Sequence, residues 1–206
     1  MSLLSRRMIL GTGLAALAAP ALADEPGPPQ PAYIGLAGHM PPLQFRMEDV
    51  ETGRMVTAAD FRGHPVILYF GFTRCPDTCP LTMQNAARLV QKLGADGQKL
   101  RVIFVTVDLT YDTAPRLKTF MAQFGKPPVF TGLRGTPAEL KAAAKRYGVF
   151  YKAPSGPDSP DPVSAIGHTD ATYLFAPDGK IVALLAALPT SRPKLGKDVA
   201  LIRRML

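Results

Sequence analysis

The sequence lacks a dense block of basic residues, a cysteine near its N-terminus and an apolar run of the ~20 residues that a membrane helix needs. Its net charge of +8 is spread along the chain, so we expect no nucleic-acid partner but a solvated surface that attracts acidic proteins or lipid head groups. Without an N-terminal cysteine, no lipid anchor is expected. Only two cysteines and three histidines occur among 206 residues, so any thiol or metal chemistry must use very few groups.

Residues 1–23 have the pattern of an export signal. Arg6 and Arg7 precede an apolar stretch, and Ala-Leu-Ala at 21–23 matches a cleavage site. We therefore expect a periplasmic or otherwise exported protein, either soluble after cleavage or held at the membrane by an uncleaved N-terminal segment, with no other membrane contact. Export implies an oxidising compartment, where two neighbouring thiols form a disulfide unless a reductant or a metal prevents it.

The remaining chain divides into a linker and one domain. Residues 24–42 are predicted to be a proline-rich linker, because "DEPGPPQPA" cannot pack a core. Residues 43–206 are long and apolar enough for a single domain with a sizeable core. At its start, two patterned segments, 43–50 and 53–61, predict a β-hairpin.

Strands and helices then alternate along the domain. The apolar runs 65–72 and 100–107 predict two strands buried in a parallel sheet, with a helix between them that begins near Pro80. A second helix is predicted over 113–124, with Asp112 or Thr113 as its N-cap.

The C-terminal part continues this pattern. A third helix is predicted over 137–147, with a capping box at its start and Gly148 as its stop. Two strands around a Pro-Asp-Gly-Lys turn look antiparallel, and 195–206 predicts a closing helix. The order indicates an α/β fold, a thioredoxin-like three-layer α/β/α sandwich with an N-terminal β-hairpin extension.

Both cysteines lie in "FGFTRCPDTCP", residues 70–80, where the first buried strand gives way to a helix. A helix N-terminus offers free N–H groups and a positive dipole end, so the pKa of Cys75 should be lowered. Three residues separate Cys75 from Cys79, a spacing that permits a disulfide, a redox pair, or two thirds of a metal site.

A metal site would need a third donor, and only three histidines are available. His64 lies in a turn before the buried strand, which favours a surface role. His39, beside a methionine, could be a secondary copper contact. His168 follows a long Pro-, Ser- and Gly-rich stretch and directly precedes a predicted strand, so it would lie on a loop at an edge of the sheet.

"FGFTRCPDTCP" together with "GHTDATYLFAPDGK" resembles the Sco/SenC family, thioredoxin-fold copper proteins that assist cytochrome c oxidase assembly. The resemblance implies that Cys75, Cys79 and His168 are copper ligands and that Asp108 is an acidic residue near the site. Two soft sulfurs and an imidazole suit Cu(I), and Cu(II) binding stays open. The sequence departs from the family at Leu109, where proline is usual.

The resemblance implies a copper chaperone that delivers copper to the dinuclear copper site of cytochrome c oxidase. Its partners would be the oxidase subunit that carries this site, and an upstream copper donor or thiol reductant. The alternative is a thiol-disulfide reductase that maintains the cysteines of that site, with Cys75 as the attacking and Cys79 as the resolving thiol. Whether the protein is an enzyme therefore stays open, as does a copper sensor or buffer.

Overall fold

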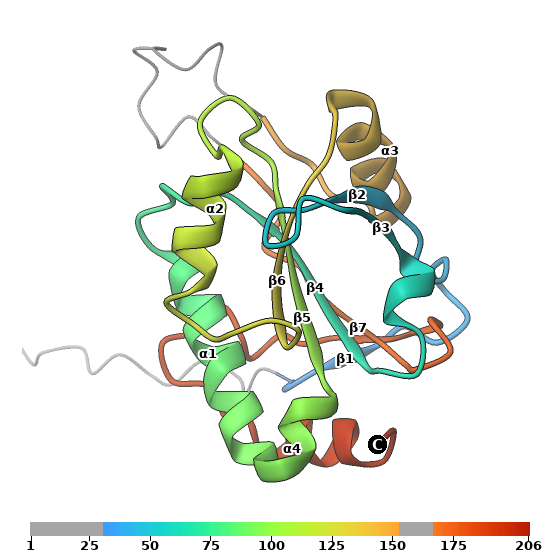
Figure 1. Cartoon of the computed structure of the whole chain (residues 1–206). Coiled ribbons are helices and arrows are strands. Elements are labelled where there is room, and N and C mark those ends of the chain that lie inside the picture. The colour runs from blue at the N-terminus through green and yellow to red at the C-terminus, as the bar shows by residue number, and fades with distance from the viewer. Residues whose placement is uncertain (1–30, 153–166) are drawn as a thin grey trace, which may run out of the picture.

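The computed structural model describes residues 31–152 and 167–206, and these fold around one eight-stranded mixed sheet (Figure 1). Its strand order is β1-β8-β7-β4-β5-β6-β2-β3. The strands are β1 (Ile34–Gly35), β2 (Arg46–Asp49), β3 (Met55–Thr57), β4 (Val66–Gly71), β5 (Arg101–Thr106), β6 (Phe130–Arg134), β7 (Thr172–Phe175) and β8 (Ile181–Leu184). The helices are α1 (Thr78–Leu93), α2 (Ala114–Met121), α3 (Pro137–Tyr147) and α4 (Gly196–Arg203).

The predicted β-α-β unit is confirmed at the centre of the sheet. β4 and β5 pair in parallel, with Val66 opposite Arg101 and Gly71 opposite Thr106. Every residue of β4 is buried, as the unbroken apolar sequence predicts for a strand covered on both faces. Because β5 and β6 are also parallel, the carboxyl ends of β4, β5 and β6 meet at one edge of the sheet.

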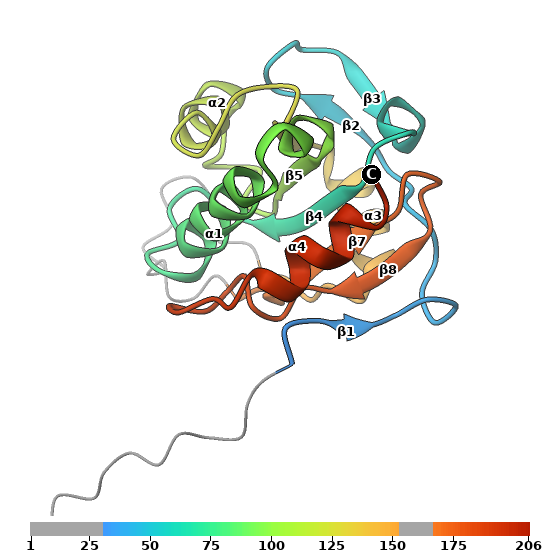
Figure 2. The same ribbon diagram turned by 90° about the horizontal axis from the view of Figure 1, so that it is seen from below.

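Helices cover both faces of the sheet, so the predicted α/β sandwich is confirmed (Figures 1 and 2). On one face, Phe104 of β5 packs against Phe120 of α2, with ring centroids 5.2 Å apart. On the other face, Tyr147 of α3 packs against Phe70 of β4 and Phe175 of β7. α4 packs on α1, where Arg203 donates a hydrogen bond to the Lys92 carbonyl.

The predicted helix ends are mostly confirmed. Thr136 caps α3 through a complete capping box with Glu139, and Gly148 ends it with φ +67°, a left-handed conformation that suits glycine. α2 is shorter than predicted, because it ends at Met121 and the chain continues in tighter turns. Thr113 is its N-cap, whereas Asp112 points into the protein and bonds other partners.

The edges of the sheet contain both confirmed and unforeseen strands. The N-terminal hairpin is confirmed, since β2 and β3 pair antiparallel, and so is the antiparallel pair of β7 and β8. β6 was not predicted, and it joins the hairpin to β5. β1 pairs with β8 and lies within the segment 24–42, so the sheet extends into the predicted linker.

The predicted export signal, residues 1–23, lies outside the described residues. Within the part of the chain that the structure describes, no helix is both long and apolar enough to cross a membrane.

One buried acid predicts how stability depends on pH. Asp198 of α4 is fully buried, and neither of its carboxylate oxygens has a hydrogen-bond partner among the described residues. Burial raises the pKa of Asp198 from 3.8 to about 7, so the folded state binds a proton that the unfolded state releases. This group should therefore lower stability as pH rises from about 4 to 7, by at most about 1.4 kcal/mol per pH unit.

Asp198→Asn should remove this loss. Chemical denaturation of wild type and variant between pH 5 and pH 8 measures it, and the variant should gain relative stability as pH rises. A difference between the two proteins that stays constant over this range would contradict the assignment.

Candidate metal centre

The sheet brings the two cysteines and the distant histidine to one edge. Cys75 lies in the turn after β4, and Cys79 is the second residue of α1. β7 runs antiparallel to β4 with Thr172 opposite Tyr69, so the end of β4 lies beside the start of β7. His168 comes just before β7 and therefore reaches the cysteines, although it is distant in sequence.

The three side chains form a compact donor set. The Sγ atoms of Cys75 and Cys79 and a ring nitrogen of His168 all lie within 4.8 Å of one another. Cys79 Sγ is 3.3 Å from His168 Nε2, and the Cys79 amide lies 3.4 Å from Cys75 Sγ, to which it donates a hydrogen bond. Cys79 is fully buried and Cys75 is partly exposed, and neither forms a disulfide. The arrangement can hold a metal ion that accepts two sulfurs and one imidazole.

The backbone after His168 sets the orientation of its ring. Nδ1 lies 3.2 Å from the Thr169 carbonyl, an acceptor, so this nitrogen carries the proton in the neutral ring. Nε2, which faces the sulfurs, then has a free lone pair, the form that binds metal. The carboxylate of Asp170 lies 3.6 Å from Nδ1. The backbone of His168 pairs with that of Tyr151 in an isolated antiparallel β-bridge.

Aromatic side chains enclose the inner side of the donor set. The His168 ring meets Tyr69 and Phe72 edge-on, with centroids 5.9 and 5.5 Å away. The Tyr69 hydroxyl lies 3.5 Å from Cys79 Sγ and 3.3 Å from an oxygen of Asp170, within reach of either acceptor. A Cβ at Gly71 would lie 2.9 Å from Cys79 Sγ, so only glycine lets the sulfur approach the strand this closely.

The two thiols differ sharply in acidity. The hydrogen bond from the Cys79 thiol lowers the pKa of Cys75 to about 3, so Cys75 is a thiolate in the reduced protein. The same interaction and burial raise the pKa of Cys79. Burial alone would lower the pKa of His168, but the Cys75 thiolate, the Thr169 carbonyl and the charge of Asp170 together raise it. A metal would therefore displace protons from the Cys79 thiol and from His168 when that ring is protonated.

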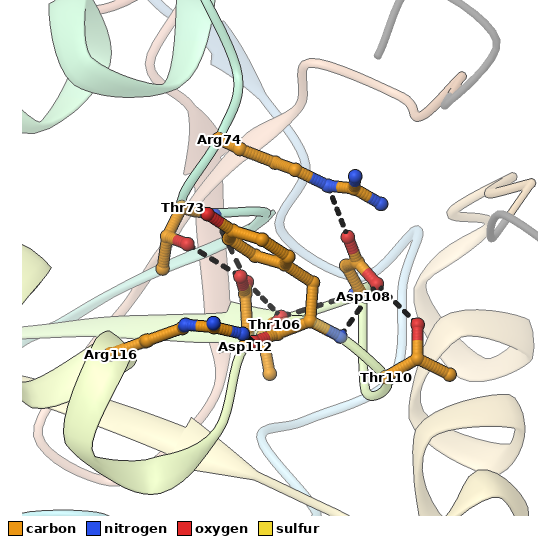
Figure 3. Close-up of polar contacts among 8 residues, drawn as sticks. Thr73, Arg74, Thr106, Asp108, Thr110, Asp112 and Arg116 are labelled. Carbon is orange, nitrogen blue, oxygen red and sulfur yellow. Dashed lines mark hydrogen bonds and ion pairs between the residues drawn. The ribbon is translucent and has the colours of Figure 1, made fainter. Parts of the chain in front are cut away.

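Two buried aspartates fix the chain immediately before Cys75 (Figure 3). Asp112 accepts hydrogen bonds from the amide and the hydroxyl of Thr73 at 2.9 and 2.5 Å, and from Thr106 at 2.5 Å. Asp108 accepts a charged hydrogen bond from Arg74 at 2.9 Å. Asp108 is therefore close to the cysteine turn, as the resemblance implied. The role of Asp112 was missed, because its position suggested only a helix cap.

The other two histidines lie apart from the donor set. His64 precedes β4, at the opposite end of that strand from Cys75, where Nδ1 lies 2.8 Å from the Lys99 carbonyl. His39 is exposed, in the segment after β1. Neither belongs to the cluster of Cys75, Cys79 and His168.

Fold and site together define a thioredoxin-like α/β protein with a two-cysteine, one-histidine cluster at the carboxyl edge of its central strands. The SCO1/SenC family model matches residues 43–201, and the chain therefore belongs to this family. A SCO2 homolog of Bos taurus is 36% identical over 129 residues, which is 62% of this chain and 47% of that protein. Protein SenC of Rhodobacter capsulatus is 36% identical over 129 residues, 62% of this chain and 55% of SenC. The chain thus spans about half the length of these curated relatives.

Solved structures give the same assignment of the fold. Bradyrhizobium japonicum ScoI, described with copper bound, matches with a TM-score of 0.66 and 29% identity over 80% of this chain and 99% of that chain. Yeast Sco1, also described with copper bound, matches with a TM-score of 0.69 and 28% identity over 81% of this chain and 91% of that one. The predicted thioredoxin-like class is confirmed by these neighbours.

The acidity of Cys75 can be tested by alkylation of the reduced, metal-free protein. We expect the rate of its reaction with iodoacetamide to stay constant as pH falls from about 8 to 5. Over the same range, an ordinary thiol with a pKa near 8.5 reacts about tenfold more slowly for each pH unit. Cys79→Ala removes the thiol donor, so the pKa of Cys75 should rise and its rate at mildly acidic pH should fall. Identical pH profiles in the two proteins would show that Cys79 does not stabilise the thiolate.

Proposed function

We propose that this protein binds copper through Cys75, Cys79 and His168. The observation that carries the proposal is the convergence of two sulfurs and one imidazole nitrogen within 4.8 Å. The copper-bound relatives ScoI and Sco1, which share the fold, support copper as the ion. A three-donor set of soft ligands suits Cu(I), whereas structural Zn(II) normally takes four ligands.

We further propose that the bound copper is cargo for the dinuclear copper site of cytochrome c oxidase. Partial exposure of Cys75 lets an incoming thiolate reach the metal, so copper can move by ligand exchange without being released to solvent. Membership of the SCO1/SenC family supports a role in oxidase assembly. The signal-like sequence at 1–23 supports an exported, periplasmic location, where an oxidase copper subunit and an upstream copper donor or thiol reductant would be its partners.

His168→Ala tests the copper site. Loss of a residue that only hydrogen-bonds a metal ligand costs roughly 10–100-fold in metal affinity. Loss of one of the three direct donors should cost more, so we expect Cu(I) binding to weaken by at least about 100-fold. The affinity is measured by competition with a Cu(I) chelator in the reduced protein. His39→Ala is the matched control and should leave the affinity unchanged. Equal affinity of His168→Ala and wild type would refute the proposed ligand set.

The difference between the two thiols supports a second function, a thiol-disulfide reductase. Cys75 is partly exposed and has a lowered pKa, as an attacking thiol requires, whereas Cys79 is buried behind it, as a resolving thiol can be. A reductase would need both cysteines but no metal, and therefore no imidazole donor.

Complementation separates the two functions. In cells that lack the protein, we expect His168→Ala to fail to restore cytochrome c oxidase activity, while the purified variant still exchanges disulfides. Cys75→Ser should fail in both assays. Restoration of oxidase activity by His168→Ala would favour the reductase over copper delivery.

A further inference from the structure

A shallow groove of about 350 Å³ lies against α2. Thr73, which lies two residues before Cys75 in the sequence, is one of its lining residues. The other lining residues that matter here are Tyr111, Arg116, Thr119, Phe120 and Gln123. A molecule seated in this groove would therefore contact the chain that leads into the cysteine turn.

Two arginines place positive charge at the groove. The guanidinium carbons of Arg74 and Arg116 lie over the Tyr111 ring, 4.6 and 4.2 Å from its centroid. The charge of Arg74 is paired with Asp108. Arg116 is exposed and donates one hydrogen bond, at 2.9 Å, to the Tyr111 carbonyl. Within 31–152 and 167–206, no carboxylate lies within ion-pair distance of Arg116, so its charge is available to a ligand.

The nearby acid does not cancel this charge at the surface. Asp112 is fully buried, and its two oxygens already accept hydrogen bonds from Thr73 and Thr106 (Figure 3). Burial raises the pKa of Asp112. The groove thus presents one unpaired guanidinium beside the aromatic rings of Tyr111 and Phe120.

We propose that this groove docks an acidic segment of the protein that receives the copper. A carboxylate of that segment pairs with Arg116, and a neighbouring apolar side chain packs on Tyr111 and Phe120. This inference rests on the proposed delivery function and adds where and by which chemistry the acceptor is recognised. Positive charge close to Cys75 speeds encounter with an acidic partner and orients it towards the metal.

Charge reversal at Arg116 tests the proposal. The rate of Cu(I) transfer from the loaded protein to the apo dinuclear-copper domain of the oxidase is measured for wild type, Arg116→Glu and Arg204→Glu. Arg204 is the matched control, because it is exposed and follows Arg203, which contacts Lys92 at the opposite end of α1 from Cys79. All three proteins should bind copper with equal affinity, since neither arginine contacts the donor set.

At low ionic strength, Arg116→Glu should transfer copper about tenfold more slowly than wild type, and the difference should shrink as salt screens the charge. Arg204→Glu should stay within about twofold of wild type. Equal slowing by both substitutions would indicate only a general effect of net charge and would overturn the docking site. Full-speed transfer by Arg116→Glu would overturn it as well.

Chemical-shift mapping of the apo protein with the same apo domain separates failure of docking from failure of delivery. We expect the largest amide shifts at Thr73, Tyr111, Arg116 and Thr119. Shifts there without any copper transfer would refute delivery but keep the docking site. Transfer accompanied by shifts elsewhere would refute the docking site but keep delivery, and the absence of both would refute both.

Discussion

The candidate metal centre depends on the antiparallel pairing of β7 with β4. The cysteines follow β4, whereas the imidazole precedes β7, so only opposite strand directions bring the two together. A slip of one residue in this register would also turn the buried side chains of β7 to the other face, at a large cost in core packing. The hydrophobic core therefore fixes the position of His168 relative to the sulfurs, and the geometry of the site follows from the stability of the sheet.

The sequence was most informative where local chemistry alone decides the structure. The apolar runs of β4 and β5 and the capping box of α3 are local signals, and each element formed where it was expected. β6 was missed because "FTGLR" includes a glycine and a charged residue, and it becomes a strand through its neighbours β5 and β2. Gly132 within it is required by packing, since a Cβ there would meet Leu117 at 2.9 Å.

The three side chains that converge in the candidate site were named from the sequence, but the roles of the residues that hold the neighbouring loops in place were not. Two cysteines at a strand-to-helix turn indicate thiol or metal chemistry, and the family resemblance named the histidine. The inward turn of Asp112 could not be foreseen, because an aspartate before a helix is an ordinary cap and its partners lie on other elements. These buried carboxylates tie the loop after β5 to the chain before Cys75 through hydrogen bonds.

The Tyr69 hydroxyl has a single proton and lies near two acceptors, Cys79 Sγ and the Asp170 carboxylate. A buried sulfur that loses its proton becomes the stronger acceptor, and a hydrogen bond given to it is withdrawn from Asp170. The single phenolic proton therefore couples the protonation of the buried sulfur to the hydrogen bonding of the chain that follows His168.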